Sequence, residues 1–238
     1  MTPGPRQLPL GVRLRDSSVF ASYFAGPNRQ AVETLLALRC GSRGPSVWVH
    51  GPTGSGKSHL LQALCVRASG VGDSATYLPL RQLAGLGIGA LAGCSQLDWV
   101  CIDDVEAVAG QADWERALFT LYTELEEAGG RLVLAAAASP VSVAFTLRDL
   151  ASRLAGGTVL RLQSLDEPQQ VAALTLRAAQ RGLELPEESA RYLLARLPRD
   201  MHSLFAFLDE LDEASLVAQR RLTVPFVSSV LKEQQADD

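Results

Sequence analysis

The sequence lacks several features that define whole classes of protein. Its four cysteines are scattered, with no CxxC pair and no histidine at metal-ligand spacing, so we expect reduced, buried thiols. No apolar run approaches the roughly 20 residues that cross a bilayer. The N-terminus does not have the charged-then-apolar layout of a signal peptide. These absences predict a cytoplasmic protein without a membrane segment.

Positive charge is also scarce. The 238 residues have a formal net charge of −4, and lysine and arginine form no cluster along the chain. A protein that mainly grips a phosphate backbone usually carries a basic patch or stripe. We therefore expect no direct sequence-specific DNA binding. Hydrophobic residues make up 47% and charged residues 20%, the balance of a globular protein with a sizeable core.

Short runs rich in valine and leucine alternate with helix-length segments in the first two thirds of the chain. The runs are residues 45–50, 75–80, 98–103, 131–136 and 158–163. This alternation predicts an α/β domain over residues 17–163, with a five-stranded parallel sheet flanked by helices. Only helical signals follow, such as the cap Asp166 before Pro168. We predict an all-helical domain over residues 164–238, and a flexible tail over residues 1–16.

The segment GPTGSGKS, residues 51–58, follows a predicted strand and opens a predicted helix. This is the pattern of a phosphate loop, in which glycines let backbone N–H groups face phosphate oxygens and the helix N-terminus adds its dipole. Lys57 is expected to reach the β- and γ-phosphates, and Ser58 to bind Mg²⁺. The predicted nucleotide-binding residues are Gly51, Pro52, Thr53, Gly54, Ser55, Gly56, Lys57 and Ser58. The alternative is a glycine-rich turn with an incidental lysine.

Two aspartates follow the apolar run 98–103. Asp103 is placed to hold Mg²⁺ or its water, together with Ser58, and Asp104 is placed to orient an attacking water as a catalytic residue. An Asp-Asp pair after a strand could instead be only a turn or a helix cap. The phosphate loop upstream favours a nucleotide site, with ADP or ATP and Mg²⁺ as cofactors.

With these motifs in this order, the chain resembles the replication-initiator branch of the AAA+ family, to which the initiator DnaA belongs. The stretches that carry the resemblance are FASYFAGPN (20–28), GSGKSHLLQALC (54–65), VCIDDVEAVAG (100–110), DLASRL (149–154), LRAAQRGLELPE (176–187) and LDEASLVAQRRLTVPFVSSVLK (211–232). The resemblance implies an AAA+ P-loop NTPase fold, with the helical domain as a lid.

The resemblance also implies roles for single residues. Arg153, in DLASRL, matches an arginine finger that acts in trans on the γ-phosphate in a neighbouring subunit; the alternative is a solvated arginine at a helix end. Phe20, Tyr23 and Asn28 match a segment that packs over adenine, although aromatic residues here could equally be plain core.

The chain departs from the family at two positions. Ala135 and Ala136 stand where a first sensor, usually Thr, Ser or Asn, hydrogen-bonds the γ-phosphate, and alanine cannot donate. His202 stands where a second sensor is usually arginine, and Arg199 lies one helical turn earlier as a substitute or a solvated charge. We therefore expect His202 at the nucleotide, and weak or absent intrinsic ATP hydrolysis.

The N-terminal segment RQLPLGV resembles the peptide by which bacterial proteins dock on the β sliding clamp. The predicted clamp-binding residues are Gln7, Leu8, Leu10 and Val12. The alternative is a tail without a partner. The family's initiator continues beyond its lid into a helix-turn-helix domain, which we do not expect here because the sequence ends at Asp238.

Together these features predict a nucleotide-bound adaptor. With the DNA-loaded β sliding clamp it would stimulate ATP hydrolysis by its partner DnaA through Arg153, and so negatively regulate replication initiation. The alternatives are a self-hydrolysing AAA+ ATPase, such as a helicase loader, and a small-molecule kinase. The sequence leaves the oligomeric state open, including a homo-oligomer.

Overall fold

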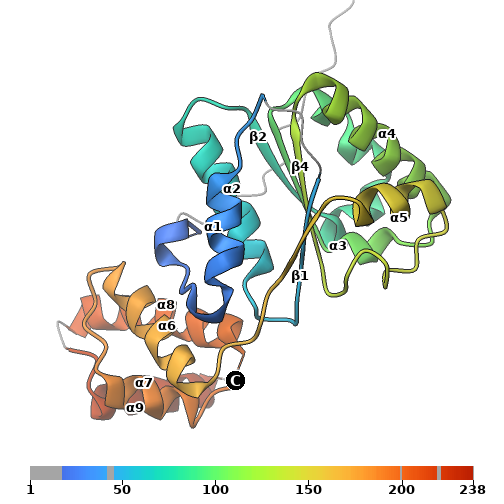
Figure 1. Ribbon diagram of the computed structural model, residues 1–238. Coiled ribbons are helices and arrows are strands. Elements are labelled where there is room, and N and C mark those ends of the chain that lie inside the picture. The colour runs from blue at the N-terminus through green and yellow to red at the C-terminus, as the bar shows by residue number, and fades with distance from the viewer. Residues whose placement is uncertain (1–17, 42–45, 199, 219–220, 238) are drawn as a thin grey trace, which may run out of the picture.

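The structure is a computed structural model that describes residues 18–41, 46–198, 200–218 and 221–237 (Figure 1). Its strands are β1 (Val47–His50), β2 (Ala75–Pro79), β3 (Trp99–Asp103), β4 (Arg131–Ala136) and β5 (Thr158–Arg161). They pair in parallel in the order β2-β3-β4-β1-β5. The predicted five-stranded parallel sheet is confirmed.

Helices cover both faces of this sheet. They are α1 (Arg29–Ala37), α2 (Lys57–Gly70), α3 (Leu80–Leu83), α4 (Ala112–Ala128) and α5 (Arg148–Ala155). Because side chains alternate along a strand, Val47 and Val49 pack with α1 and α2, whereas Trp48 packs with α3, α4 and α5. Figure 1 shows these two helix layers on opposite sides of the strands.

The functional motifs meet at the carboxyl edge of the sheet. β1 ends at His50, directly before the phosphate loop, and His50 pairs with Ala136 at the end of β4. The neighbouring β3 ends at Asp103. Ligands of open parallel sheets bind at this edge. The topology therefore brings the phosphate loop, Asp103 and the end of β4 together.

A helical domain follows β5, as predicted. It consists of α6 (Glu167–Ala179), α7 (Glu187–Leu194), α8 (Met201–Ala218) and α9 (Val224–Asp237), which share a separate hydrophobic core. Asp166 caps α6, because its carboxylate accepts from the Gln169 amide at 2.9 Å while the Gln169 side chain accepts from the Asp166 amide. Asp200 likewise accepts from the Ser203 amide at the start of α8, at 2.9 Å.

Two further predictions concern the cysteines and the membrane. All four cysteines are free thiols, and Cys65, Cys94 and Cys101 are buried. Within the described ranges, no helix has both the length and the apolar character needed to span a bilayer.

Candidate functional site

The phosphate loop turns tightly between β1 and α2. Gly54 and Gly56 have φ angles of +79° and +89°, which side chains other than hydrogen rarely allow. A Cβ on Gly56 would also lie 2.5 Å from Cε2 of Tyr23. Both a left-handed backbone and a close aromatic neighbour therefore require glycine at position 56. The hydroxyl of Ser55 is buried and finds no hydrogen-bond partner among the described residues, so this loop fits an additional polar group.

Lys57 begins α2 and points back over the loop. Its ammonium donates to the carbonyl oxygen of Gly51 at 2.7 Å. Burial lowers the pKa of Lys57, and the negative charges of Asp103, Glu106 and Asp104 oppose that shift. Lys57 is thus a partly desolvated cation beside three carboxylates, a charge arrangement suited to the phosphates and metal of a nucleotide.

Asp103 is held in place at the end of β3. Its side chain is 1% exposed, and its two oxygens accept from the Tyr77 hydroxyl at 2.8 Å and from the Asp104 amide at 3.0 Å. Burial and the Asp103 charge raise the pKa of Tyr77, while Ser58 lowers it. Asp103 is thus a buried and oriented carboxylate at the end of β3, while Ser58 is exposed in the first turn of α2. Among the described residues, no three metal-binding side chains cluster, so phosphate oxygens and water would complete the metal's shell.

Asp104 is engaged with a residue that sequence reasoning missed. Its φ of +53° is the only positive value at a non-glycine residue in the described chain, and such strain is concentrated at functional sites. The Asp104 carboxylate forms an ion pair with Arg81 of α3, 3.3 Å from Nε to Oδ2. The residue predicted to orient an attacking water is therefore paired with a neighbouring cation, in an ion pair whose arginine is 68% exposed.

The end of β4 carries no polar side chain. Ala135 and Ala136 are both fully buried, one in each core. Glu106, another residue missed from the sequence, accepts from the Ala137 amide at 3.2 Å, and its second oxygen is buried without a partner among the described residues. A carboxylate thus stands next to the strand end where the family resemblance implies a hydroxyl or amide.

A pocket lies between the phosphate loop and the helical domain. Residues 54–56 form one side, Tyr23 and Phe24 another, and Met201 and Phe205 the lid side. The Tyr23 hydroxyl donates to the carbonyl of Ser55 at 3.0 Å, and burial raises the pKa of Tyr23 to about 12. This aromatic and apolar lining beside a phosphate loop is suited to a planar base.

The other two predicted adenine residues are not among those lining the pocket. Phe20 packs against the core formed with α1 and α2. Asn28 is 2% exposed and donates to the Tyr23 hydroxyl and to the Gln163 carbonyl, while its own oxygen accepts from the Gln163 amide at 2.7 Å. Asn28 thus supports Tyr23 from behind and joins the N-terminal segment to the connection between β5 and the lid.

His202 is exposed at the start of α8 and is not among the residues that line the pocket. The neighbouring Met201 amide lies 3.7 Å from the position of a Cβ on Gly54. Arg199 lies outside the described residues, as do the predicted clamp-binding residues Gln7, Leu8, Leu10 and Val12.

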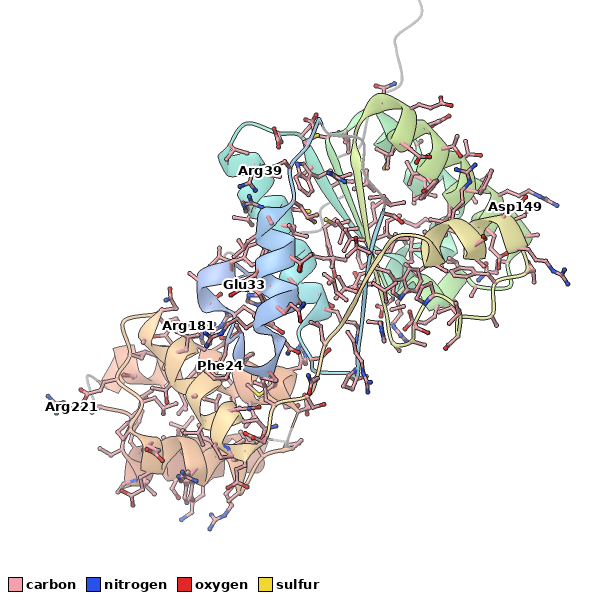
Figure 2. The ribbon with its side chains drawn as sticks, viewed as in Figure 1. Phe24, Glu33, Arg39, Asp149, Arg181 and Arg221 are labelled. Atoms are coloured by element: carbon pink, nitrogen blue, oxygen red, sulfur yellow. The ribbon has the colours of Figure 1, made fainter. Side chains whose placement is uncertain are left out.

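Arg153 lies apart from this pocket, on α5. Its side chain is 47% exposed, and its guanidinium is 3.4 Å from Glu126 and lies over the rings of Phe119 and Tyr122. Figure 2 shows α5, labelled at Asp149, at the opposite end of the molecule from the helical domain, with Phe24 between them. The structure therefore brings together the phosphate loop, Asp103 and Asp104, and keeps Arg153 away from the pocket of its own chain.

Comparison with known families identifies the helical domain. Residues 166–231 match the family model described as "Hda, lid domain". The helical domain is therefore similar to the lid domain of Hda. The matched region supplies Met201 and Phe205 to the pocket, so it includes one wall of the candidate site.

Over most of its length, the chain has the fold of DnaA domain III. It superimposes on domain III of DnaA from Thermotoga maritima with a TM-score of 0.74 and 20% identity, over 93% of this chain and 98% of that one. AMPPCP-bound DnaA from Aquifex aeolicus gives 0.71 and 21%, over 94% and 71%. The RuvB Holliday junction branch migration motor from T. maritima gives 0.61 and 17%, over 88% and 67%. The predicted AAA+ core with a helical lid is confirmed.

Proposed function

We propose that this chain is a nucleotide-bound cytoplasmic adaptor that stimulates ATP hydrolysis by DnaA. It would act with the DNA-loaded β sliding clamp, through Arg153, and so negatively regulate replication initiation. The observation that carries the proposal is the position of Arg153, an exposed guanidinium that is not among the residues lining its own chain's pocket. The Hda lid and the DnaA-like AAA+ fold support DnaA as the partner.

The adaptor would hold ADP or ATP in its own site. Residues 51–58 would bind the phosphates, Ser58 and Asp103 would hold Mg²⁺, and the base would enter the pocket under the Hda lid, with His202 at its edge. The likeness to AMPPCP-bound DnaA supports an adenine nucleotide. Bound Mg²⁺ would supply positive charge between the phosphates and Asp103. Because Asp104 is paired with Arg81 and the end of β4 is apolar, the residues of this chain favour holding a nucleotide over hydrolysing it.

Arg153 would act on the nucleotide of DnaA. A guanidinium keeps its charge at all physiological pH values and presents several donors in a plane. Placed beside the γ-phosphate of a partner, it would stabilise the negative charge that develops there. An arginine supplied in trans contributes on the order of 10³–10⁵ in rate in other NTPases.

The N-terminal tail would bring the adaptor to the clamp. Gln7 would hydrogen-bond at the rim of a clamp pocket, and Leu8, Leu10 and Val12 would fill it. Each buried leucine contributes roughly 1.5–3 kcal/mol, and ordering of the peptide offsets much of that gain. A weak contact results, which the several sites of a ring strengthen through effective concentration.

Phosphate release by ATP-loaded DnaA, in the presence of clamp on DNA and of the ADP-loaded chain, tests the proposal. Arg153→Ala should lower the rate to that of DnaA without the chain. Arg148→Ala, an exposed arginine on the same helix, is the matched control and should retain the full rate. Equal stimulation by Arg153→Ala and the parent would refute the arginine-finger role. Rapid turnover by the chain alone would favour the self-hydrolysing ATPase.

A further inference from the structure

One face of α4 contacts α5 and the two residues that precede it. Glu115 contacts Thr146 and Leu147 just before α5, and Glu126 contacts Arg153 within it. The α4 stripe consists of Glu115, Phe119, Tyr122 and Glu126, whose spacing of four, three and four residues places them on one side of the helix. We propose that the α4 stripe positions Arg153, with Glu115 fixing the start of α5 and Glu126 restraining the guanidinium until a phosphate competes for it. This inference rests on the proposed function, because it assigns positioning residues to its arginine finger.

Glu115 anchors the chain where α5 begins. It is fully buried, and its carboxylate accepts from the Leu147 amide at 2.6 Å, from the Thr146 amide at 3.0 Å and from the Thr146 hydroxyl at 2.8 Å. It also accepts from the Gly110 amide at 2.7 Å. Burial alone would raise the pKa of Glu115, but these hydrogen bonds lower it. Since Leu147 is the N-cap residue of α5, a charged carboxylate holds the N-terminus of the helix that carries Arg153.

The rest of the α4 stripe holds the arginine side chain. The Arg153 guanidinium carbon lies 5.6 Å from the ring centre of Phe119 and 5.7 Å from that of Tyr122, within cation–π distance. Its Nη1 is 3.4 Å from Oε2 of Glu126. Two aromatic rings therefore set the direction of the side chain, and Glu126 occupies the guanidinium edge that a phosphate oxygen would need.

The two carboxylates differ in how easily they can be replaced. Glu115 is fully buried with amide and hydroxyl donors on both of its oxygens, so replacing one oxygen with an NH2 group leaves some of those donors without an acceptor. The Glu126 and Arg153 side chains are 45% and 47% exposed, and exposed ion pairs contribute little. A doubly charged phosphate in a partner's site can displace Glu126 from Arg153. The same helix therefore carries one residue that supports stimulation and one that opposes it.

The restraint is tested with Glu126→Gln. Phosphate release by limiting ATP-loaded DnaA with clamp on DNA should increase by about two- to fivefold, the range an exposed ion pair can contribute. Asp113→Asn is the matched control, because Asp113 forms an exposed ion pair with Arg116 on the same helix, at 3.3 Å. The control should leave the rate unchanged. An unchanged or lower rate for Glu126→Gln would overturn the restraint.

The anchor is tested with Glu115→Gln. The maximal stimulated rate should fall about tenfold or more, while the DnaA concentration for half-maximal stimulation and the ADP affinity stay as in the parent. Thr146→Val removes one hydrogen bond without changing Glu115, and it should lower the maximal stimulated rate by about two- to tenfold. If Glu115→Gln does not fold, Thr146→Val serves as the test. A full maximal rate in the folded variant would overturn the anchor.

Hydrogen exchange separates this inference from the proposed function. The amides of residues 146–154 should exchange faster in Glu115→Gln and Thr146→Val than in the parent, whether or not DnaA is the partner. If Arg153→Ala keeps full stimulation but exchange follows this pattern, the proposed function fails and the anchoring of α5 stands. Parent-like exchange in both variants would overturn the anchoring itself.

Discussion

The nucleotide pocket and Arg153 lie in different parts of the molecule, since Arg153 is not among the residues that line the pocket, and their charged groups are held in different ways. At the pocket, Lys57 donates to the Gly51 carbonyl of its own loop, and the buried Asp103 accepts from the Tyr77 hydroxyl. By contrast, Arg153 rests on aromatic rings with one exposed partner. A group that holds a ligand is best preorganised and desolvated, whereas a group that acts on another molecule must stay within reach. This difference fits the two proposed tasks, in which the pocket holds a nucleotide and Arg153 acts on the nucleotide of a partner.

Lys57→Ala should weaken nucleotide binding at the pocket and leave Arg153 unaffected. It removes the cation that faces the phosphates, and hydrogen bonds to charged groups contribute about 1.5–3 kcal/mol. ADP binding, measured by calorimetry, should weaken by about 10- to 150-fold. Arg196→Ala, an exposed arginine on the lid that packs on Tyr192, is the control and should bind as the parent does. Equal ADP affinity in both variants would remove Lys57 from the site.

Asn28→Ala tests how much the hydrogen bonds of Asn28 to Tyr23 and Gln163 stabilise the fold. The change leaves the backbone groups of Gln163 and the Tyr23 hydroxyl short of a partner, so unfolding free energy should fall by about 1–3 kcal/mol. The melting temperature should drop by about 2–4 °C per kcal/mol. Thr34→Ala, which removes an exposed hydrogen bond to Gln30, should lower the melting temperature by much less. Comparable losses in the two variants would contradict the supporting role of Asn28.

Acidification should give the smallest effect. Burial lowers the pKa of His59 below 6.5, the Val19 carbonyl opposes that shift and Arg177 adds to it. The unfolded chain therefore takes up a proton first, so stability is full above pH 6.5 and falls as the pH drops below that value. Melting temperatures between pH 8 and 5 should decline less in His59→Asn than in the parent. His50, whose pKa burial also lowers, contributes part of the remaining slope. Identical slopes would exclude His59.

Local sequence patterns were enough to predict the sheet, the phosphate loop and the lid. Valine- and leucine-rich runs predicted all five strands, because strands of a parallel sheet are apolar on both faces. The glycines and Lys57 required a specific turn before α2, and Asp166 with Pro168 predicted the start of α6. Each of these signals lies within about ten residues of the element that it defines.

The residues that were missed act through contacts between distant segments. Tyr77 reaches Asp103 because β2 and β3 are neighbours, and Arg81 reaches Asp104 from the helix after β2. Glu115 meets Thr146 only when α4 and α5 pack on the same face. Asn28 was predicted to line the adenine pocket, but its side chain contacts Gln163, 135 residues away. Strand order and helix packing decide these contacts, and no short motif encodes them.

The most direct test measures the nucleotide pocket and Arg153 in one reaction. Arg153→Ala, loaded with labelled ADP, is mixed with ATP-loaded DnaA and clamp on DNA, and bound ADP and released phosphate are followed together. The account predicts that the variant keeps its ADP as the parent does while DnaA hydrolyses ATP at its unstimulated rate. Parent-like phosphate release, or loss of ADP from the variant, would contradict the separation of holding a nucleotide from acting on one.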